Sequence, residues 1–363
     1  MKKLDGKIGG REFASIVILT IGIKAADTTP TLLFEGGQQA TWMIPLFCFL
    51  TIIIPFLFLL RLLKKFEDKG LIDIIYNITG KYVGFVIGMI LFVLMVIGSS
   101  LNSRSYIDII SVLFYPTTPL PFIYFCLMLT AYFVANRGLQ AIGRTAWLIL
   151  PLVKLALLLL VVFVWWEVEF ANLFPLEGPG LDAVAIQGAK FSSILSELIF
   201  LGVLYPFIRS FQTFKKAGWF GIVFSVVEIS LFIALFIMVF SYPSIHSIAF
   251  PFQTLTQMAE VTQIVDHTES FYLIFWVVGS VIHFSIYLYV TTAVFTYTLK
   301  LKEPEPLIMP MAGLVLLVGM LPQNLSQTIL ITRENFLYVT SVVVFVLPIF
   351  LWSVDWIKGR TQA

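Results

Sequence analysis

The sequence has little charge and few of the residues on which enzyme chemistry depends. Of its 363 residues only 12% are charged, and it contains 2 cysteines and 3 histidines. His246, His267 and His283 are too scattered to suggest a zinc site. Cys48 and Cys126 both fall inside apolar runs, so each is expected to be a small buried hydrophobe rather than half of a disulfide. We therefore expect neither a metal site nor a cofactor.

Several catalytic motifs are also missing. The chain has no His-Glu-x-x-His, no Gly-x-Ser-x-Gly, no phosphate-binding glycine loop and no pair of catalytic aspartates. The sequence therefore does not predict an enzyme, whether an intramembrane protease or an ATP-driven pump. Its Lys and Arg residues flank apolar runs instead of forming one basic face, so no nucleic-acid partner is expected.

The sequence is rich in long runs of hydrophobic residues. Hydrophobic residues make up 59% of the chain, and 35 residues are phenylalanine. A helix needs about 20 apolar residues to cross the hydrocarbon layer of a bilayer. Ten such runs occur, at residues 12–34, 40–62, 83–112, 119–136, 143–166, 190–210, 217–241, 270–298, 306–324 and 335–356. The predicted fold class is an all-α polytopic membrane protein with ten transmembrane helices, in which residues 1–363 form a single domain within the lipid bilayer.

The positive charges predict how the chain is oriented. Most of the 23 Lys and Arg residues fall on the side of the basic N-terminus, which lacks a cleavage site, and the opposite side keeps only Lys190 and Arg333. By the positive-inside rule, both termini are expected in the cytoplasm. Between the second and third runs, residues 71–81 place apolar side chains at helical spacing. This pattern predicts a short helix on the inner membrane surface.

Two of the ten runs are interrupted. Gly22, Lys24 and Asp27 break the first run, and Gly202 followed by Pro206 breaks the sixth. Unpaired backbone is tolerated in lipid only where protein buries it or where it lines a cavity. Matching breaks in two halves of a transporter indicate an inverted repeat with the ligand near the midplane, where freed N–H groups attract an anionic group. We expect repeat one at about 10–166 and repeat two at about 188–356. A glycine that only permits close helix packing is the alternative.

Ionisable residues at membrane depth are costly, so each is a functional candidate with structural pairing as the alternative. Lys24 either meets a ligand carboxylate or forms a salt bridge to Asp27 or Glu197. Lys154, in the fifth run, either gains and loses a proton or only anchors carbonyl groups at the break of the first helix. Glu228 is a candidate partner for Lys154.

Other polar residues complete the predicted site. Arg104 and Asp108 are expected to form an i, i+4 pair, with a gate as the alternative. His283 and Tyr287 are one helical turn apart and share a face of their helix. They are expected either to contact the ligand or to be packing residues that form hydrogen bonds. The predicted ligand contacts are Gly22, Ile23, Lys24, Ala25, Leu94, Gly98, Ser99, Phe200, Leu201, Gly202, Tyr205, His283 and Tyr287, and the predicted coupling or gating residues are Lys154, Arg104, Glu197 and Glu228.

The order and spacing of several segments resemble one family. The segments are the broken first helix ahead of Gly37 to Trp42, Arg104 followed by Thr118 and Pro119, RGLQAIGR from Arg137, NLFPLEGPG from Asn172, ESFYLIFWVVGSVIHFSIYLYV from Glu269 and LPQN from Leu321. Together they are similar to the permease-like B subunit of nutrient germinant receptors. This is the spore germination permease family, a branch of the amino acid–polyamine–organocation superfamily. The chain departs from it by placing Ile23 and Lys24 after Gly22, where the family usually has small residues.

The resemblance implies an architecture, a location and a function. It implies two inverted sets of five helices, as in the bacterial leucine transporter, in the inner membrane of a spore or in the cell membrane. It also implies A-type and C-type receptor subunits as partners and a small nutrient, often an amino acid, as the trigger for germination. In proton-coupled relatives, a fifth-helix lysine like Lys154 takes the place of a sodium ion. A proton-coupled amino acid transporter is therefore the first alternative, and an ion or water conduit or a scaffold subunit is the second.

Overall fold

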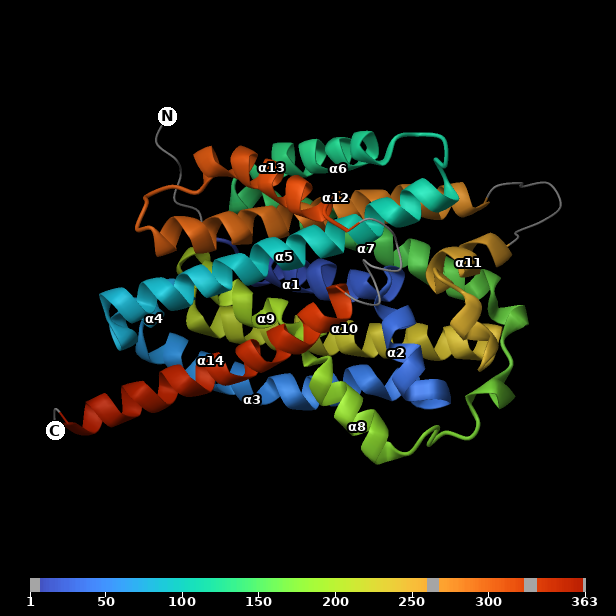
Figure 1. Ribbon diagram of the computed structural model, residues 1–363, viewed down its shortest axis with the longest axis horizontal. Helices are drawn as coiled ribbons and strands as arrows, with labels where there is room; N and C mark the ends of the chain where they lie inside the picture. The colour runs from blue at the N-terminus through green and yellow to red at the C-terminus, as the bar shows by residue number, and fades with distance from the viewer. Residues whose placement is uncertain (1–6, 260–267, 323–331, 362–363) are drawn as a thin grey trace.

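The computed structural model describes residues 7–259, 268–322 and 332–361. Within these ranges the regular structure is helical, apart from an isolated β-bridge between Ile8 and Ile208. Most of the long helices run along the long axis of the molecule, and α5 (Lys81–Leu113) extends over much of its length (Figure 1). Buried apolar side chains from all parts of the chain form one core between these helices.

Six helical stretches of the described residues are long and apolar enough to cross a membrane. They contain α3 (Ile44–Lys65), α5, α7 (Leu139–Phe163), α10 (Phe211–Phe240), α12 (Thr268–Thr298) and α14 (Glu334–Thr361). These helices match the second, third, fifth, seventh, eighth and tenth predicted runs. Ser210 caps α10 by accepting a hydrogen bond from the Thr213 N–H, so this helix begins ahead of its apolar run. The structure thus confirms an all-helical protein with long apolar spans.

The other predicted spans are shorter or interrupted. The fourth corresponds to α6 (Leu120–Ala135) and the ninth to η8 (Glu305–Leu307) with α13 (Ile308–Gly319). The last two residues of the LPQN motif, Gln323 and Asn324, lie outside the described residues. A total of ten spans, and the division into two repeats, therefore stay predictions.

The first predicted span is interrupted where the sequence indicates. α1 (Gly10–Ile21) is followed by the 3₁₀ turn η1 (Gly22–Ala26) and then by α2 (Thr29–Gly37). Pro30 lies in the first turn of α2, where its missing N–H costs nothing. Every residue of η1 is buried, so the irregular backbone is enclosed by protein.

The sixth predicted span is more irregular than expected and is interrupted earlier. It consists of the end of α8 (Leu181–Lys190), η5 (Ser192–Leu195), α9 (Glu197–Phe200) and η6 (Leu201–Phe207). Serine hydroxyls compete with helical hydrogen bonds, and here the Ser193 hydroxyl donates to the Leu337 carbonyl at 2.8 Å. The Ser193 N–H donates to the Ser341 hydroxyl at 2.9 Å. Helix α14 therefore satisfies backbone and side-chain groups that the break leaves free, well ahead of Gly202.

Shorter elements close the two ends of the bundle. The predicted surface helix is present as α4 (Leu71–Thr79), which buries its apolar face against α5 and η6. The remaining elements are η2 (Gln38–Met43), η3 (Trp165–Glu167), η4 (Phe170–Leu173), η7 (Ser244–Ser247) and α11 (Pro251–Met258). α4 and the end of α14 lie at one end of the bundle, and α11 lies at the other (Figure 1). α11 covers the break in the first span, because Gln253 donates to the Ala26 carbonyl at 3.1 Å.

Candidate functional site

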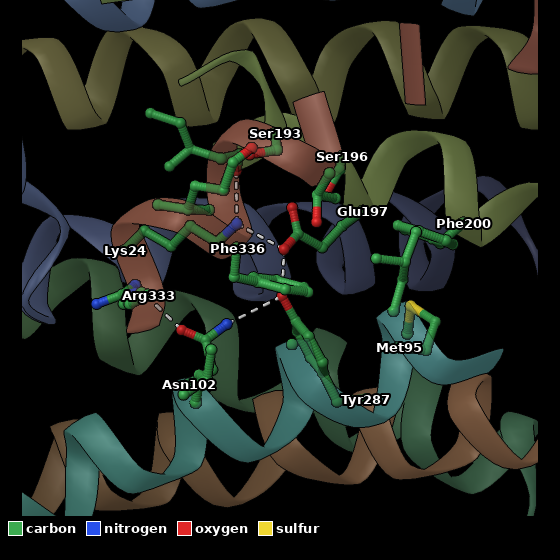
Figure 2. A pocket seen from close by; sticks show the side chains of 16 residues that line it. Lys24, Met95, Asn102, Ser193, Ser196, Glu197, Phe200, Tyr287, Arg333 and Phe336 are labelled. Carbon is green, nitrogen blue, oxygen red and sulfur yellow. Dashed lines mark hydrogen bonds and ion pairs between the residues drawn. The ribbon is translucent and has the colours of Figure 1, made fainter. Parts of the chain in front are cut away.

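A small cavity lies between the two interrupted spans and helices α5, α12 and α14 (Figure 2). Its volume is about 40 Å³, which corresponds to a few water molecules. The predicted site residues that line it are Lys24, Leu94, Gly98, Glu197, Phe200 and Tyr287. The lining residues that were not predicted are Met95, Leu101, Asn102, Ser193, Ile194, Ser196, Arg333, Phe336, Leu337 and Thr340.

The first charged pair at this cavity joins the two breaks. Lys24 of η1 donates to Glu197 Oε1 at 2.5 Å and to the Ile194 carbonyl at 2.5 Å. The Lys24 and Glu197 side chains are only 4% and 10% exposed. Tyr287 of α12 donates its hydroxyl hydrogen to the same carboxylate oxygen. Of the alternatives that the sequence left open for Lys24, the structure therefore shows the salt bridge to Glu197.

A second charged pair lies at the same cavity, and sequence reasoning missed it. Arg333, at the start of α14, donates to Asp27 Oδ2 at 2.8 Å, and both side chains are almost fully buried. The guanidinium also donates to the hydroxyls of Thr28 and Thr29. Charge counting places Arg333 on the outer surface, whereas the structure buries it against the break. The sequence feature that could have pointed to Arg333 is Asp27, because a carboxylate at membrane depth requires a cationic partner.

Asn102 of α5 links the two pairs. Its amide oxygen accepts from Arg333 at 3.1 Å, and its amide nitrogen donates to the Tyr287 hydroxyl at 3.1 Å. Figure 2 shows the resulting chain of contacts from Arg333 through Asn102 and Tyr287 to Glu197 and Lys24. Buried charges are tolerated only when they are paired and hydrogen-bonded. This network therefore fixes both interrupted spans relative to α5, α12 and α14.

A second cavity of about 30 Å³ adjoins the same break and is lined by Gly22, Ile23, Ala25 and Lys154. Lys154 forms an ion pair with Glu228 of α10. A Cβ atom on Gly22 would lie 2.5 Å from Glu228 Oε2, so any larger residue at this position would have to displace this carboxylate. The predicted residues of the break are thus divided between two cavities. Lys24 lines the first, and Gly22, Ile23 and Ala25 line the second beside Lys154 of α7.

Several predicted residues lie outside both cavities. Leu201, Gly202 and Tyr205 are buried in η6 but line neither of them. A Cβ on Gly202 would contact Leu59 at 3.3 Å, so this glycine faces α3. The wall of the first cavity is formed by residues 193–200 instead, because the irregular backbone begins at η5.

Other predicted residues support the site from behind. Ser99 shares a hydrogen bond with the Thr291 hydroxyl at 3.1 Å. His283 Nδ1 lies 3.2 Å from the Leu19 carbonyl, so this histidine connects α12 to α1. Arg104 and Asp108 form the pair that their spacing predicts, at 2.8 Å. The Arg104 guanidinium also donates to the Gly319 carbonyl at 3.2 Å, which connects α5 to α13.

Comparisons with known proteins agree with this architecture. Spore germination protein KB of Bacillus subtilis (strain 168) is 23% identical over 269 residues, which cover 71% of each chain. Spore germination protein B2 of the same organism is 21% identical, with full coverage of both chains. Mhp1, a nucleobase-cation-symport-1 family transporter solved in a closed conformation with bromovinylhydantoin bound, matches with a TM-score of 0.60. This match covers 94% of the present chain and 78% of Mhp1 at 13% identity.

The structural likeness shows that the chain has the fold of a membrane transporter, of the bacterial leucine transporter type that the resemblance implies. Together with its long apolar helices, this fold identifies the chain as a multi-pass membrane protein. The model of the family described as "Spore germination protein" matches residues 11–328, most of the chain. The chain therefore belongs to the spore germination permease family.

Proposed function

We propose that the chain is the membrane subunit of a spore nutrient germinant receptor and that a small nutrient, such as an amino acid, binds in the cavity of Figure 2. The observation that carries the proposal is the position of this cavity between two interrupted spans, with the Lys24–Glu197 pair in its wall. Such breaks hold the substrate in secondary transporters. Membership of the spore germination family supports a role in the spore. The excess of Lys and Arg on the side of the N-terminus supports a cytoplasmic location for both termini.

The proposal includes a route from binding to signal. A cavity of about 40 Å³ is too small for an amino acid, so a bound nutrient must move its walls. Those walls belong to five separate parts of the chain that the ion-pair network connects. Binding therefore favours a different arrangement of these parts, and a ligand shifts such an equilibrium by its difference in affinity for the two arrangements. A-type and C-type receptor subunits are the proposed recipients of this change.

A proton-coupled amino acid transporter is the second candidate, and one observation favours it. Lys154 and Glu228 form an ion pair directly beside the break at Gly22. A group that gains or loses a proton at this position would act on the backbone that also carries Lys24. This alternative requires net uptake of the nutrient, and Lys154→Met should abolish that uptake.

Blocking the cavity tests the proposed function. Gly98 lines the cavity, and a Cβ there would already lie 3.2 Å from the Phe336 ring, so Gly98→Leu fills the space. Gly313 of α13 has no atom within 4 Å of its Cβ position, so Gly313→Leu is the matched control. Spores carrying Gly98→Leu should lose the germination response while the protein remains in the membrane at the parental amount. Spores carrying Gly313→Leu should respond normally.

The same variants separate the competing functions. A normal germination response of Gly98→Leu spores would show that the cavity is not the nutrient site. Uptake of labelled amino acid into proteoliposomes would favour the transporter, and ligand-independent ion leak would favour a conduit. Co-purification with A-type and C-type subunits would support the receptor assignment.

A further inference from the structure

The break in the first span carries an ammonium and a carboxylate of its own. The ammonium of Lys24 is bound by the Ile194 carbonyl and by Glu197. The carboxylate of Asp27 accepts from the Thr29 N–H at the start of α2 at 2.6 Å and from Arg333 at 2.8 Å. The first pair of groups, a carbonyl and a carboxylate, could equally bind the ammonium of a ligand. The second pair, the N-terminus of α2 and a guanidinium, could equally bind the carboxylate of a ligand. Both of these places are occupied by the side chains of the protein itself.

The charges at the cavity also cancel. Lys24 is paired with Glu197, and Arg333 is paired with Asp27, so these four buried side chains have no net charge. An uncompensated charge in a buried site is strongly unfavourable. If a ligand with a net charge bound here, its charge would remain unpaired, because each of the four charged side chains is already paired with another.

Two side-chain oxygen atoms in the wall of this cavity have unused hydrogen-bonding capacity: a carboxylate oxygen, which only accepts, and a threonine hydroxyl, which can accept or donate. Glu197 Oε2 and Thr340 Oγ1 belong to lining residues, are buried and have no hydrogen-bond partner in the described part of the chain. In Figure 2, one carboxylate oxygen of Glu197 carries the contacts to Lys24 and Tyr287, and the other carries none. A carboxylate oxygen without a donor is costly, so it favours a ligand that donates a hydrogen bond.

From these three observations we propose that the cavity selects a small uncharged ligand that has a hydrogen-bond donor and a short apolar group, such as a primary carboxamide. The donor group would bind Glu197 Oε2 and Thr340 Oγ1, and the apolar group would contact Leu94 and Phe336. This inference rests on the proposed binding site, and it replaces the amino acid given there as an example of the nutrient with an uncharged ligand. Zwitterionic amino acids are disfavoured because Lys24 and Asp27 already occupy the places that their charged groups need.

A series of ligands of nearly equal size tests the inference on the full-length protein in lipid nanodiscs. Propionamide is uncharged, propionate is an anion, n-propylammonium is a cation and alanine is a zwitterion. Isothermal titration calorimetry should show propionamide binding about tenfold or more tightly than each of the other three, because only propionamide donates a hydrogen bond without bringing a charged group. Equal or tighter binding of any of the other three would overturn the inference.

Variants of the wall provide a second test. Thr340→Val keeps the shape and removes a hydroxyl that can bond to the carboxamide, so it should weaken propionamide binding about threefold to tenfold. Asp27→Asn leaves Arg333 without its carboxylate, so this variant should gain propionate binding. Lys24→Met leaves Glu197 without its ammonium and should gain n-propylammonium binding. Failure of both charge variants to gain these ligands, in protein that remains folded by circular dichroism, would also overturn the inference.

The outcomes distinguish this inference from the proposed function. If Gly98→Leu abolishes germination and alanine is nevertheless the preferred ligand, the receptor assignment holds and the inference is wrong. If none of the four ligands binds the parent protein and Gly98→Leu spores germinate normally, the proposed site is wrong and the inference falls with it.

Discussion

Arg333 and Asp27 lie 306 positions apart in the sequence, yet they form an ion pair of 2.8 Å with side chains that are 4% and 1% exposed. Arg333 directly precedes α14, and Asp27 directly follows the 3₁₀ turn of the first span. Asp27 also accepts a hydrogen bond from the Thr29 N–H, so the pair lies at the N-terminus of α2 and satisfies one of its free N–H groups. One guanidinium therefore holds the last long helix, α5 and the broken first span together at the cavity.

Removing this guanidinium should strongly destabilise the protein. Arg333→Gln leaves the Asp27 carboxylate buried without its cation, and breaking a buried pair on one side costs about 3–5 kcal/mol. We expect a lower midpoint of thermal unfolding in detergent. Arg61→Gln is the matched control because Arg61 lies on the surface of α3. Equal midpoints for the two variants would show that the pair contributes nothing to folding.

The Lys24–Glu197 pair should show strong coupling in a double-mutant cycle. Lys24→Met and Glu197→Gln each leave one buried group without its partner, so each single variant should lose stability. The double variant removes both charges and should lose clearly less than the sum of the two losses. Chemical unfolding of the four proteins measures the coupling free energy, for which we expect about 1–3 kcal/mol. Additive losses would indicate that the two groups do not interact in the membrane.

Local sequence predicted one break well and the other poorly. In the first span, Gly22 and the polar residues after it interrupt the apolar run, so the signal lies within the segment itself. In the sixth span the break occurs at η5, where Ser193 bonds to Leu337 and Ser341, 144 and 148 positions away. The sequence pattern contains no information about these distant partners. It therefore indicated Gly202, the conspicuous local residue.

The same distinction explains the residues of the site. Lys24, Glu197 and Tyr287 could be proposed because a polar group at membrane depth is unusual in itself. Arg333 lies next to a membrane boundary, where arginine is common, so charge counting assigned it to the surface. Asn102 gave no signal because an uncharged amide within a long apolar helix is unremarkable until its partners are known.

Site-directed labelling should test the predicted orientation. Ser247 lies in η7 near α11, and Lys215 is exposed near the start of α10. Cys48 is buried as the sequence predicts, but the prediction that Cys126 is buried is wrong, because its thiol is exposed on the outer face of α6. Both single-cysteine variants therefore need a Cys126→Ser background. A membrane-impermeant maleimide should label Ser247→Cys in intact cells, and should label Lys215→Cys only after the membrane is opened. The reverse pattern would place both termini outside and overturn the topology.

The glycine at the first break should be intolerant of even one added methyl group. A Cβ at Gly22 would lie 2.5 Å from Glu228 Oε2, and this carboxylate cannot move without disturbing its ion pair with Lys154. Gly22→Ala should therefore lower stability and impair the germination response. Gly10→Ala, at the other end of α1, is the control because its Cβ would meet its nearest neighbour, Thr213, at an ordinary 3.5 Å.

The physical cause can be checked by removing the obstacle. Glu228→Ala creates space at the break at the expense of the ion pair, so adding Gly22→Ala to this variant should cost little more. Thermal unfolding of the single and double variants measures this non-additivity. If Gly22→Ala is as harmful in the Glu228→Ala background as in the parent, the glycine is required for another reason, such as the backbone geometry of the 3₁₀ turn. The Glu228 carboxylate would then not be the reason that this position is a glycine.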